Sequence, residues 1–322
     1  MKRILILGGS GFVGRAVCEQ LAAHPVLGAA RLVVPTRRRA RARHLLPLPQ
    51  VDVIEADVNQ DRALQRLLHG TDAVVNLVAI LHGRPDDFEH AHVDLCQRLA
   101  EDCVKVGVKR VVHVSALGVG DDPTAAPSHY LRTKAEGEQA LCVNGLDLTV
   151  LRPSVIFGAH DRFFNLFAAL QRVFPVMPLA GGDARFQPVW VEDVAAALVC
   201  CLADPAVSVG RTFELGGPEV CTLAEIVKLA GRWSGNARPV LPMPVAAGRL
   251  QAAAMALLPG EPLMSADNLD SMKVPNVLSG GLPGLEALGV SPAAMSAVVP
   301  AYLGARRNWA EQLDAWRAQA RR

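Results

Sequence analysis

The stretch that decides the fold is residues 4–14, Ile-Leu-Ile-Leu-Gly-Gly-Ser-Gly-Phe-Val-Gly. Its first four residues form a continuous apolar run, which is typical of a buried parallel strand. Gly8, Gly11 and Gly14 follow as a GxxGxxG pattern. In this pattern the glycines permit a tight turn, a close approach of pyrophosphate to the backbone, and close packing of helix on strand, while the helix N-terminus attracts the phosphates. The stretch therefore predicts a dinucleotide-binding turn between a strand and a helix.

Working outward, short apolar runs alternate with segments suited to helices over the first 150 residues. The strand candidates are residues 4–7, 32–34, 51–54, 73–77, 111–114 and 148–151, and the helix candidates are residues 13–23, 60–68 and 88–106. This alternation predicts an α/β fold, a Rossmann-type doubly wound parallel sheet. We expect an NAD(P)-binding Rossmann domain over 1–157. A smaller, partly interleaved C-terminal lobe is expected over 158–322, with some segments returning to the sheet and an amphipathic helix over 305–322.

Composition excludes several classes of protein. The chain has 322 residues, of which 51% are hydrophobic and 20% charged, so it can bury a large core and is not disordered. A net charge of +2, and a basic run at 37–43 without interleaved aromatic residues, argue against nucleic acid as a partner. Seven cysteines without a CxxC motif, and nine histidines without an HxxxH motif, predict neither a disulfide scaffold nor a metal site.

The sequence predicts neither a signal peptide nor a membrane-spanning helix. The first apolar run has only four residues, fewer than the roughly 7–15 that a signal peptide needs, and no run of about 18 apolar residues predicts a membrane span. We therefore expect a cytoplasmic protein. Trp309 and Trp316 stand among arginines in the predicted C-terminal helix. This pattern leaves open a peripheral association with the inner face of a membrane or with a protein complex.

The end of the second predicted strand selects between NAD and NADP. An acidic residue there would bind the ribose 2′-hydroxyl of NAD, but the chain runs into Thr36, Arg37 and Arg38 with no acid nearby. Guanidinium groups pair well with a phosphate dianion, so we predict that NADP(H) is favoured over NAD(H). A 2′-phosphate needs only one or two of the arginines at 37–43. The remaining arginines are unexplained. They could form a solvated helix face or bind the surface of an anionic partner.

Two further strand ends are predicted to contact the dinucleotide. Asp57 and Val58 follow the third strand, where the adenine ring usually lies, and small residues at 77–79 follow the fourth. A role as a loop cap stays open for both. The predicted cofactor-binding residues are Gly8, Ser10, Gly11, Phe12, Val13, Gly14, Thr36, Arg37, Arg38, Asp57, Val58, Leu77, Val78, Ala79, Ser115, Tyr130, Lys134, Pro153, Ser154 and Val155.

Ser115, Tyr130 and Lys134 form the predicted catalytic group. Ser115 ends the fifth strand, and Tyr130 and Lys134 are four residues apart in a predicted helix, which places both on one face. A tyrosine with a pKa of about 10 exchanges protons poorly at neutral pH, and a neighbouring ammonium stabilises its phenolate. The serine hydroxyl would hold a substrate carbonyl beside the tyrosine. The alternative is an incidental pair on a surface helix.

The order of these motifs resembles that of the extended and atypical short-chain dehydrogenases/reductases. Members of that family show GxxGxxG, then an Asp-Val pair, a serine, YxxxK and an Arg-Pro-Ser segment, as at 152–154 here, and residues 188–195 resemble the VxDVA segment of its epimerase/dehydratase-like members. The segments 35–38, 114–118, 130–138 and 151–158 look most like the subfamily that contains the dinucleotide-binding accessory subunit of mitochondrial complex I.

The resemblance implies a bound nucleotide, usually NADPH, which in that subfamily can be held for structure without established turnover. Some relatives are tied to ubiquinone synthesis. The sequence departs from the family pattern at His92, where extended members usually carry an asparagine that positions a proton-relay water. Ser115 and Tyr130 are also only 15 residues apart, closer than in sugar epimerases. Both departures weigh against nucleotide-sugar chemistry.

Two functions remain open from the sequence. One is an NADP(H)-dependent oxidoreductase that acts on a small or isoprenoid, quinone-like carbonyl compound through Ser115, Tyr130 and Lys134. The other is a dinucleotide-binding structural or assembly protein, related to the complex I accessory subunit or to ubiquinone synthesis. The intact catalytic group favours the first, whereas the resemblance and His92 favour the second.

Overall fold

The computed structural model describes residues 1–256 and 264–304, and the chain divides into two compact units. The first unit consists of Met1–Pro153, Val191–Leu215 and Leu278–Ser291, and the second consists of the intervening segments and of the chain from Pro292 on. The first continuous segment ends at Pro153 rather than at the expected residue 157, because Ile156–Phe157 (β7) pairs with Val189–Trp190 (β10) in the second unit. The predicted helix at 305–322 lies outside the described residues.

A seven-stranded parallel sheet forms the centre of the first unit. Its order is β11-β6-β5-β4-β1-β2-β3, and every neighbouring pair is parallel. The strands are β1 (Arg3–Leu7), β2 (Arg31–Thr36), β3 (Val51–Glu55), β4 (Ala73–Asn76), β5 (Arg110–Val114), β6 (Asp147–Pro153) and β11 (Arg211–Leu215). The order reverses between β1 and β4, which is where doubly wound sheets bind their ligands. The Rossmann-type fold is confirmed, although β11 was not assigned from the sequence.

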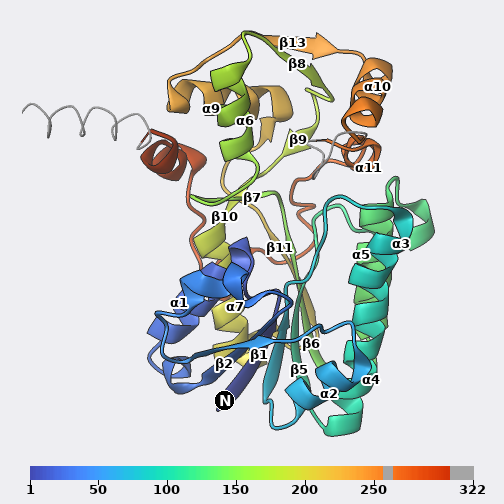
Figure 1. Cartoon of the computed structure of the whole chain (residues 1–322), viewed down its shortest axis with the longest axis vertical. Helices are drawn as coiled ribbons and strands as arrows, with labels where there is room; N and C mark the ends of the chain where they lie inside the picture. The colour runs from blue at the N-terminus through green and yellow to red at the C-terminus, as the bar shows by residue number, and fades with distance from the viewer. Residues whose placement is uncertain (257–263, 305–322) are drawn as a thin grey trace, which may run out of the picture. The chain divides into compact units, whose positions relative to one another are not determined.

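Helices cover both faces of this sheet (Figure 1). On one face lie α1 (Phe12–Ala23) and α7 (Val191–Ala203), and on the other lie α2 (Asp61–Leu68), α4 (Leu95–Val106) and α5 (His129–Leu141). Short helical segments are η1 (Leu27–Ala29), η2 (Arg39–Leu45), α3 (Pro85–Phe88), η3 (Glu89–Asp94), η4 (Pro123–Ala125), α8 (Pro205–Ser208) and η5 (Leu285–Leu288). Because the sheet is covered on both sides, Ile4, Leu5, Ile6 and Leu7 are completely buried.

A buried arginine ties the returning segment of the chain to the sheet. From β5, Arg110 Nη1 donates to the carbonyl oxygen of Asp147 (2.7 Å) and to Thr149 Oγ1 (2.9 Å). Its Nη2 donates to the carbonyl oxygen of Cys201 (2.7 Å) and to Ser208 Oγ (2.9 Å). These hydrogen bonds satisfy most of a guanidinium that is 5% exposed. They connect α7 and α8 to β5 and β6.

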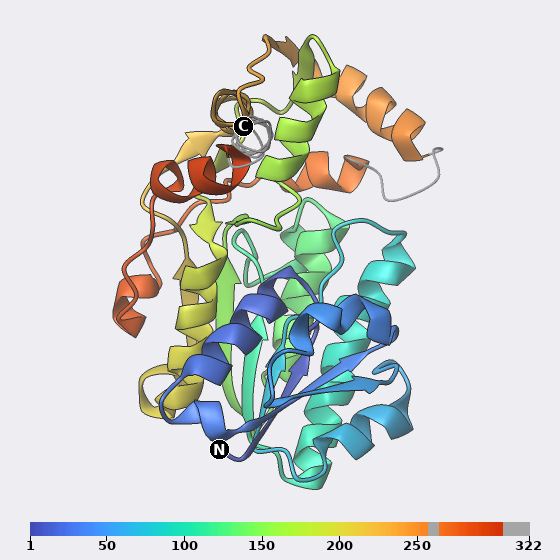
Figure 2. The same ribbon diagram turned by 60° about the vertical axis from the view of Figure 1, so that its left-hand side comes forward.

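The second unit has its own apolar core, and Figure 2 shows the ribbon of its helices and short strands. Its helices are α6 (Phe164–Val173), α9 (Leu223–Ser234), α10 (Val245–Ala256) and α11 (Ala266–Ser271). Besides β7 and β10, two short strand pairs join β8 (Met177–Ala180) to β13 (Val240–Met243) and β9 (Arg185–Phe186) to β12 (Cys221–Thr222). Helix α9 starts with a capping box, in which Thr222 Oγ1 accepts the Glu225 N–H (3.2 Å) and Glu225 Oε2 accepts the Thr222 N–H (2.8 Å). Among the described residues, no helix is long and apolar enough to cross a membrane.

Candidate dinucleotide and acid–base site

The glycine turn after β1 has no room for side chains. Gly8 has φ +79°, in the left-handed region that favours glycine, and a β-carbon there would lie 3.0 Å from the Leu77 carbonyl carbon. A β-carbon on Gly14 would lie 2.4 Å from Gly9 Cα and 2.6 Å from the Gly8 oxygen. The Gly11 N–H donates to that same Gly8 oxygen (2.9 Å) and closes the turn. Helix α1 therefore packs against the turn only because Gly14 lacks a side chain.

The same turn leaves the start of α1 open to a ligand. The helix begins at Phe12, its N-cap is Gly11, and no side chain caps it. The first N–H groups of a helix, here those of Phe12, Val13 and Gly14, have no partner within the helix and attract anions. Ser10 lies within the turn itself. The cradle fits the pyrophosphate of a dinucleotide, because glycine at Gly8 and Gly11 lets phosphate oxygens reach the backbone.

The neighbouring strand ends border this cradle. Leu77 follows β4, and its N–H donates to the Leu7 oxygen (2.9 Å), which places the segment of Leu77, Val78 and Ala79 directly beside the glycine turn. Asp57 follows β3, and its Oδ1 accepts the Asn59 N–H (3.0 Å). Val58 packs against the apolar core between the sheet and α2 and α4. Asp57 therefore serves as a loop cap, and an adenine contact stays a prediction for its other oxygen.

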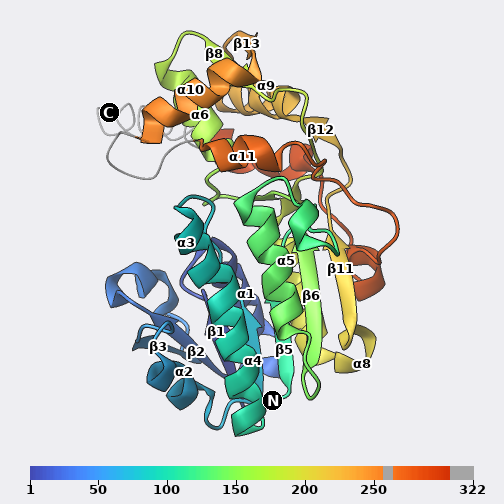
Figure 3. The same ribbon diagram turned by 90° about the vertical axis from the view of Figure 1, so that its right-hand side faces the viewer.

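The predicted 2′-phosphate residues are the last residue of β2, a strand labelled in Figure 3, and the two residues that follow it. Thr36 is 8% exposed, and its Oγ1 accepts the Arg38 N–H (3.4 Å) and donates to the Arg38 oxygen (3.2 Å). This turn leads the chain into η2 and leaves the side chains of Arg37 and Arg38 exposed. Neither guanidinium pairs with a carboxylate among the described residues. Both are therefore free to bind an anion.

Ser115 and Lys134 lie close together at the end of β5. Ser115 is 4% exposed, and its Oγ has no hydrogen-bond partner among the described residues. Helix α5 starts at the N-cap Ser128, whose Oγ accepts the Leu131 N–H (3.2 Å), and this start fixes Tyr130 in the first turn. Lys134, one turn later, donates from Nζ to the oxygen of Val114 (2.8 Å), the residue before Ser115. The structure therefore brings the lysine to the serine, and the half-buried tyrosine lies one helical turn away.

Burial shifts the pKa of both ionisable members of this group. The pKa of Lys134 is lowered from 10.5 to about 8 by desolvation, which Cys96 and Glu138 only partly offset. Desolvation also raises the pKa of Tyr130 from 10.0 to about 12. At pH 7 the tyrosine is therefore a neutral O–H donor, and the lysine is still mostly charged. The arrangement can donate a proton more readily than it can remove one.

Both ring nitrogens of His92, where the resemblance leads us to expect an asparagine, are engaged. Its Nε2 accepts the Ile80 N–H (3.1 Å), so the proton is assigned to Nδ1, which donates to Thr133 Oγ1 (2.9 Å). Burial, with a smaller contribution from the Lys134 charge, lowers the pKa of His92 to about 2. Its ring meets that of Tyr130 edge to face, with centroids 5.6 Å apart. His92 thus supports Tyr130 as a neutral, satisfied histidine and has no nitrogen left to hold a relay water.

His113 is a second buried histidine near this group. On β5, His113 Nδ1 lies 3.2 Å from Asn76 Nδ2, so it is assigned as the acceptor. The other nitrogen, Nε2, is buried and has no hydrogen-bond partner among the described residues. Burial holds the pKa of His113 well below its usual range, and Lys134 adds to this. Asn76, which ends β4, therefore holds the His113 ring through this hydrogen bond.

The last predicted cofactor residues lie where the chain enters the second unit. Pro153 ends β6, and its oxygen accepts the Leu117 N–H (2.9 Å). Ser154 Oγ donates to Asn276 Oδ1 (2.7 Å), and the Val155 N–H donates to the same oxygen (3.0 Å). The hydroxyl of Ser154 and the amide of Val155 are thus used within the second unit. Asn276, which the sequence did not point to, therefore holds Ser154 and Val155 in place.

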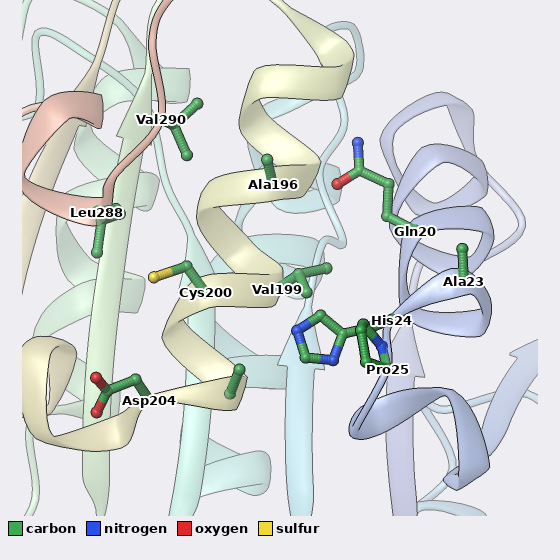
Figure 4. A pocket seen from close by; sticks show the side chains of 11 residues that line it. Gln20, Ala23, His24, Pro25, Ala196, Val199, Cys200, Asp204, Leu288 and Val290 are labelled. Atoms are coloured by element: carbon green, nitrogen blue, oxygen red, sulfur yellow. The ribbon is translucent and has the colours of Figure 1, made fainter.

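A groove of about 530 Å³ opens elsewhere on the first unit, between α1, α7 and residues 288–290 (Figure 4). Gln20, His24, Val199, Cys200 and Leu288 are among its lining residues, and none of the predicted site residues lines it. Burial and Asp204 raise the pKa of Cys200, so its thiol is not activated. Among the described residues, no group of three histidines, cysteines or carboxylates lies close enough to hold a metal ion.

Comparison with known proteins agrees with this geometry. The profile of the NAD dependent epimerase/dehydratase family matches residues 4–216. The mitochondrial "NADH dehydrogenase [ubiquinone] 1 alpha subcomplex subunit 9" of Mus musculus is 31% identical over 89% of this chain and 76% of its own length. The protein of the same name from Arabidopsis thaliana is 34% identical over 70% of this chain, but the match spans only 56% of that protein.

Solved structures resemble most of the chain. An NADPH-dependent quinone oxidoreductase from Escherichia coli has a TM-score of 0.74 at 20% identity, covering 93% of this chain and 99% of its own. A dTDP-glucose 4,6-dehydratase from Streptomyces venezuelae has a TM-score of 0.73 at 21% identity, covering 98% of both chains. At these identities the likeness shows the shared fold.

Proposed function

Because the chain belongs to the NAD dependent epimerase/dehydratase family, we propose that it binds NADP(H) at the carboxyl ends of β1, β2 and β4. We further propose that it reduces a small or quinone-like carbonyl compound. The glycine cradle at Gly8, Gly11 and Gly14 supports the pyrophosphate position. The exposed Arg37 and Arg38, with no acid at the end of β2, support the choice of NADP(H) over NAD(H).

The chemistry assigned to the side chains follows from their protonation. The bound nicotinamide would supply a hydride. Tyr130, neutral at pH 7 with a pKa of about 12, donates the proton from Oη to the carbonyl oxygen of the substrate. The ammonium of Lys134 stabilises the phenolate that remains. Ser115 Oγ, which is buried without a partner among the described residues, donates to the same carbonyl oxygen and orients it.

The buried Ser115 hydroxyl is the observation that carries the catalytic proposal. A buried hydroxyl without a hydrogen bond costs roughly 1–3 kcal/mol, so a native fold keeps one only where a ligand or an ordered water satisfies it. It lies at the strand end next to Val114, whose oxygen already binds Lys134. A substrate oxygen at this place would satisfy the hydroxyl.

Cofactor choice is tested by binding. Titration of NADPH and NADH should show at least tenfold tighter binding of NADPH, about 1.4 kcal/mol, because the arginine–phosphate pair is lost without the 2′-phosphate. Arg37→Ala with Arg38→Ala should abolish that preference. Equal affinities for the two cofactors would refute the preference for NADPH.

Turnover is tested separately. With any active carbonyl or quinone, Tyr130→Phe should abolish NADPH oxidation and leave NADPH affinity nearly unchanged. A Tyr130→Phe variant that keeps its rate would remove Tyr130 from the catalytic proposal.

His92 favours a second candidate, a dinucleotide-binding structural or assembly protein of the kind that the complex I subunits represent. After Tyr130 gives up its proton, a relay must restore it. Both nitrogens of His92 are engaged with Ile80 and Thr133, and Lys134 Nζ donates to Val114. This candidate predicts that NADPH co-purifies and raises the melting temperature, while a broad carbonyl and quinone screen shows no oxidation. A cytoplasmic location with peripheral association at a membrane or a protein complex remains our expectation.

A further inference from the structure

The segment between β2 and β3 carries five exposed arginines. They are Arg37, Arg38, Arg39, Arg41 and Arg43. No aspartate or glutamate occurs between Glu19 and Asp52. A 2′-phosphate needs only the first two of these side chains. The last three, which we call the η2 arginines (Arg39, Arg41 and Arg43), therefore have no role in the proposed cofactor site.

The η2 arginines differ from other arginines of the same unit. Arg15 pairs with Glu19 at 2.9 Å, and Arg152 pairs with Glu138 at 2.6 Å. Arg31, Arg84 and Arg132 also pair with carboxylates. Among the described residues, by contrast, no η2 arginine has a hydrogen bond or an ion pair from its guanidinium group. Their charge is left uncompensated on the surface.

The segment that carries these charges is an ordered part of the fold. Ala42 and Leu45 of η2 are completely buried, so the segment is anchored in the unit's core. The Arg41 N–H donates to the Arg38 oxygen (3.0 Å), and the Leu46 N–H donates to the Arg43 oxygen (3.2 Å). A kink at Ala42 (φ −102°, ψ 15°) divides η2, so Arg39 and Arg41 precede the kink and Arg43 follows it. All three side chains are exposed.

We propose that the η2 arginines, together with Leu46, dock the first unit on an anionic lipid bilayer. Leu46 directly follows η2 and is 53% exposed. Arginines beside an exposed apolar residue are typical of a surface that contacts headgroups and the edge of the acyl layer. Three uncompensated positive charges complement the anionic headgroups of a bilayer. No phenylalanine, tyrosine or tryptophan occurs over 37–50, so the segment lacks the large rings on which the bases of single-stranded nucleic acid usually stack.

The test is vesicle co-sedimentation of the full chain, with NADPH saturating, on phosphatidylcholine vesicles with and without phosphatidylglycerol. The variant Arg39→Gln/Arg41→Gln/Arg43→Gln removes the η2 arginines. A matched control, Arg62→Gln/Arg66→Gln/Lys109→Gln, removes the same charge from other exposed positions of the unit. At about 1 kcal/mol for each basic residue near the surface, the first variant should bind anionic vesicles roughly 100-fold more weakly. The control variant should bind like the unmodified protein.

Further results are specific to this docking surface. Binding should require phosphatidylglycerol and weaken strongly between 0.1 and 1 M salt, as the Debye length falls from about 10 to about 3 Å. NADPH affinity and melting temperature should be unchanged in the η2 variant, because the proposal does not depend on the cofactor function. The proposal is overturned if the unmodified protein ignores anionic vesicles, if both variants bind alike, or if the η2 variant loses NADPH instead. It is also overturned if the η2 arginines bind only an acidic protein segment.

Discussion

At the scale of single residues, Gly14 carries the tightest contact of the glycine turn. Gly14→Ala places a β-carbon 2.4 Å from Gly9 Cα and 2.5 Å from the Gly9 oxygen. Backbone atoms must move, so we expect a loss of about 1–3 kcal/mol in the free energy of unfolding and at least tenfold weaker NADPH binding. Thermal melting and calorimetric titration measure the two effects. Gly120→Ala is the control, because a β-carbon at Gly120 meets nothing within 4 Å.

Lys134 makes stability depend on pH with a defined sign. Its pKa is about 8 when folded and near 10.5 when unfolded, so between these values the unfolded chain holds a proton that the folded protein has released. The free energy of unfolding therefore rises with pH in this window. The contribution of Lys134 is on the order of 3 kcal/mol at most. The measurement is a set of denaturant titrations of the unmodified protein and of Lys134→Met from pH 7 to 10. Cysteines and tyrosines titrate in both proteins, so the difference between the two free energies of unfolding reports Lys134.

The expected outcome is a closing gap between the two proteins. Lys134→Met should gain stability over the unmodified protein at pH 7, because it removes a buried charge. That advantage should shrink as the pH passes 8 and the lysine of the folded protein becomes neutral. A difference that stays constant with pH would contradict a lowered pKa at Lys134.

At the scale of elements, η3 and α5 approach so closely that one glycine decides their packing. The segment η3 is a π-helix, although the sequence predicted one continuous α-helix over 88–106. A β-carbon on Gly137 of α5 would lie only 2.3 Å from the His92 oxygen. His92 in turn packs on Tyr130, so this contact controls where the tyrosine ring lies. π-Helical turns are often found at functional sites.

Gly137→Ala tests this packing through its sign. In an open helical position the change would stabilise the protein by about 1 kcal/mol, because alanine favours helix. Here the clash with the His92 oxygen should reverse the sign, and we expect the free energy of unfolding to fall by roughly 1–3 kcal/mol. Chemical denaturation is the measurement. A stabilised variant would mean that α5 and η3 separate easily, and the positioning role given to His92 would then be wrong.

At the scale of the whole molecule, the carboxylate of Asp161 links two segments of the second unit that lie far apart in the sequence. Asp161 is 5% exposed and accepts backbone N–H groups from Gly158 (3.0 Å), Phe163 (2.9 Å) and Asn165 (3.1 Å). Its Oδ2 also accepts the hydroxyl of Tyr302 at 2.8 Å. Desolvation, followed by the charge of Asp161, raises the pKa of Tyr302, so the phenol stays a donor. A residue near the end of the described chain is thus joined to a loop 141 positions earlier.

Tyr302→Phe should therefore destabilise the second unit alone. A hydrogen bond to a charged group contributes about 1.5–3 kcal/mol, and we expect a loss of that size. Trp190 and Trp233 lie in the second unit, so tryptophan fluorescence should show the earlier unfolding. NADPH affinity should stay unchanged, because the glycine cradle belongs to the first unit. A variant with weaker NADPH binding and unchanged fluorescence would contradict this separation.

Local sequence patterns determined the elements that hold the cofactor cradle. All six predicted strands are present, because a parallel strand covered on both faces must be apolar along its whole length. Glycine spacing predicted the turn after β1, since only glycine allows the contacts of Gly8 and Gly14. The four-residue spacing of Tyr130 and Lys134 was sufficient to place them on one helix, because helical periodicity is local.

Only the tertiary structure decided how distant segments complete the site. In the tertiary structure β11 joins the edge of the sheet, and Lys134 Nζ donates to the Val114 oxygen. Both ring nitrogens of His92 form hydrogen bonds. The tertiary structure also leaves Ser115 Oγ and His113 Nε2 buried without hydrogen-bond partners among the described residues. The physical reason is that partnership and desolvation depend on neighbours brought together from far along the chain. Residue type and spacing predict which groups can react, whereas burial and hydrogen bonding set their protonation.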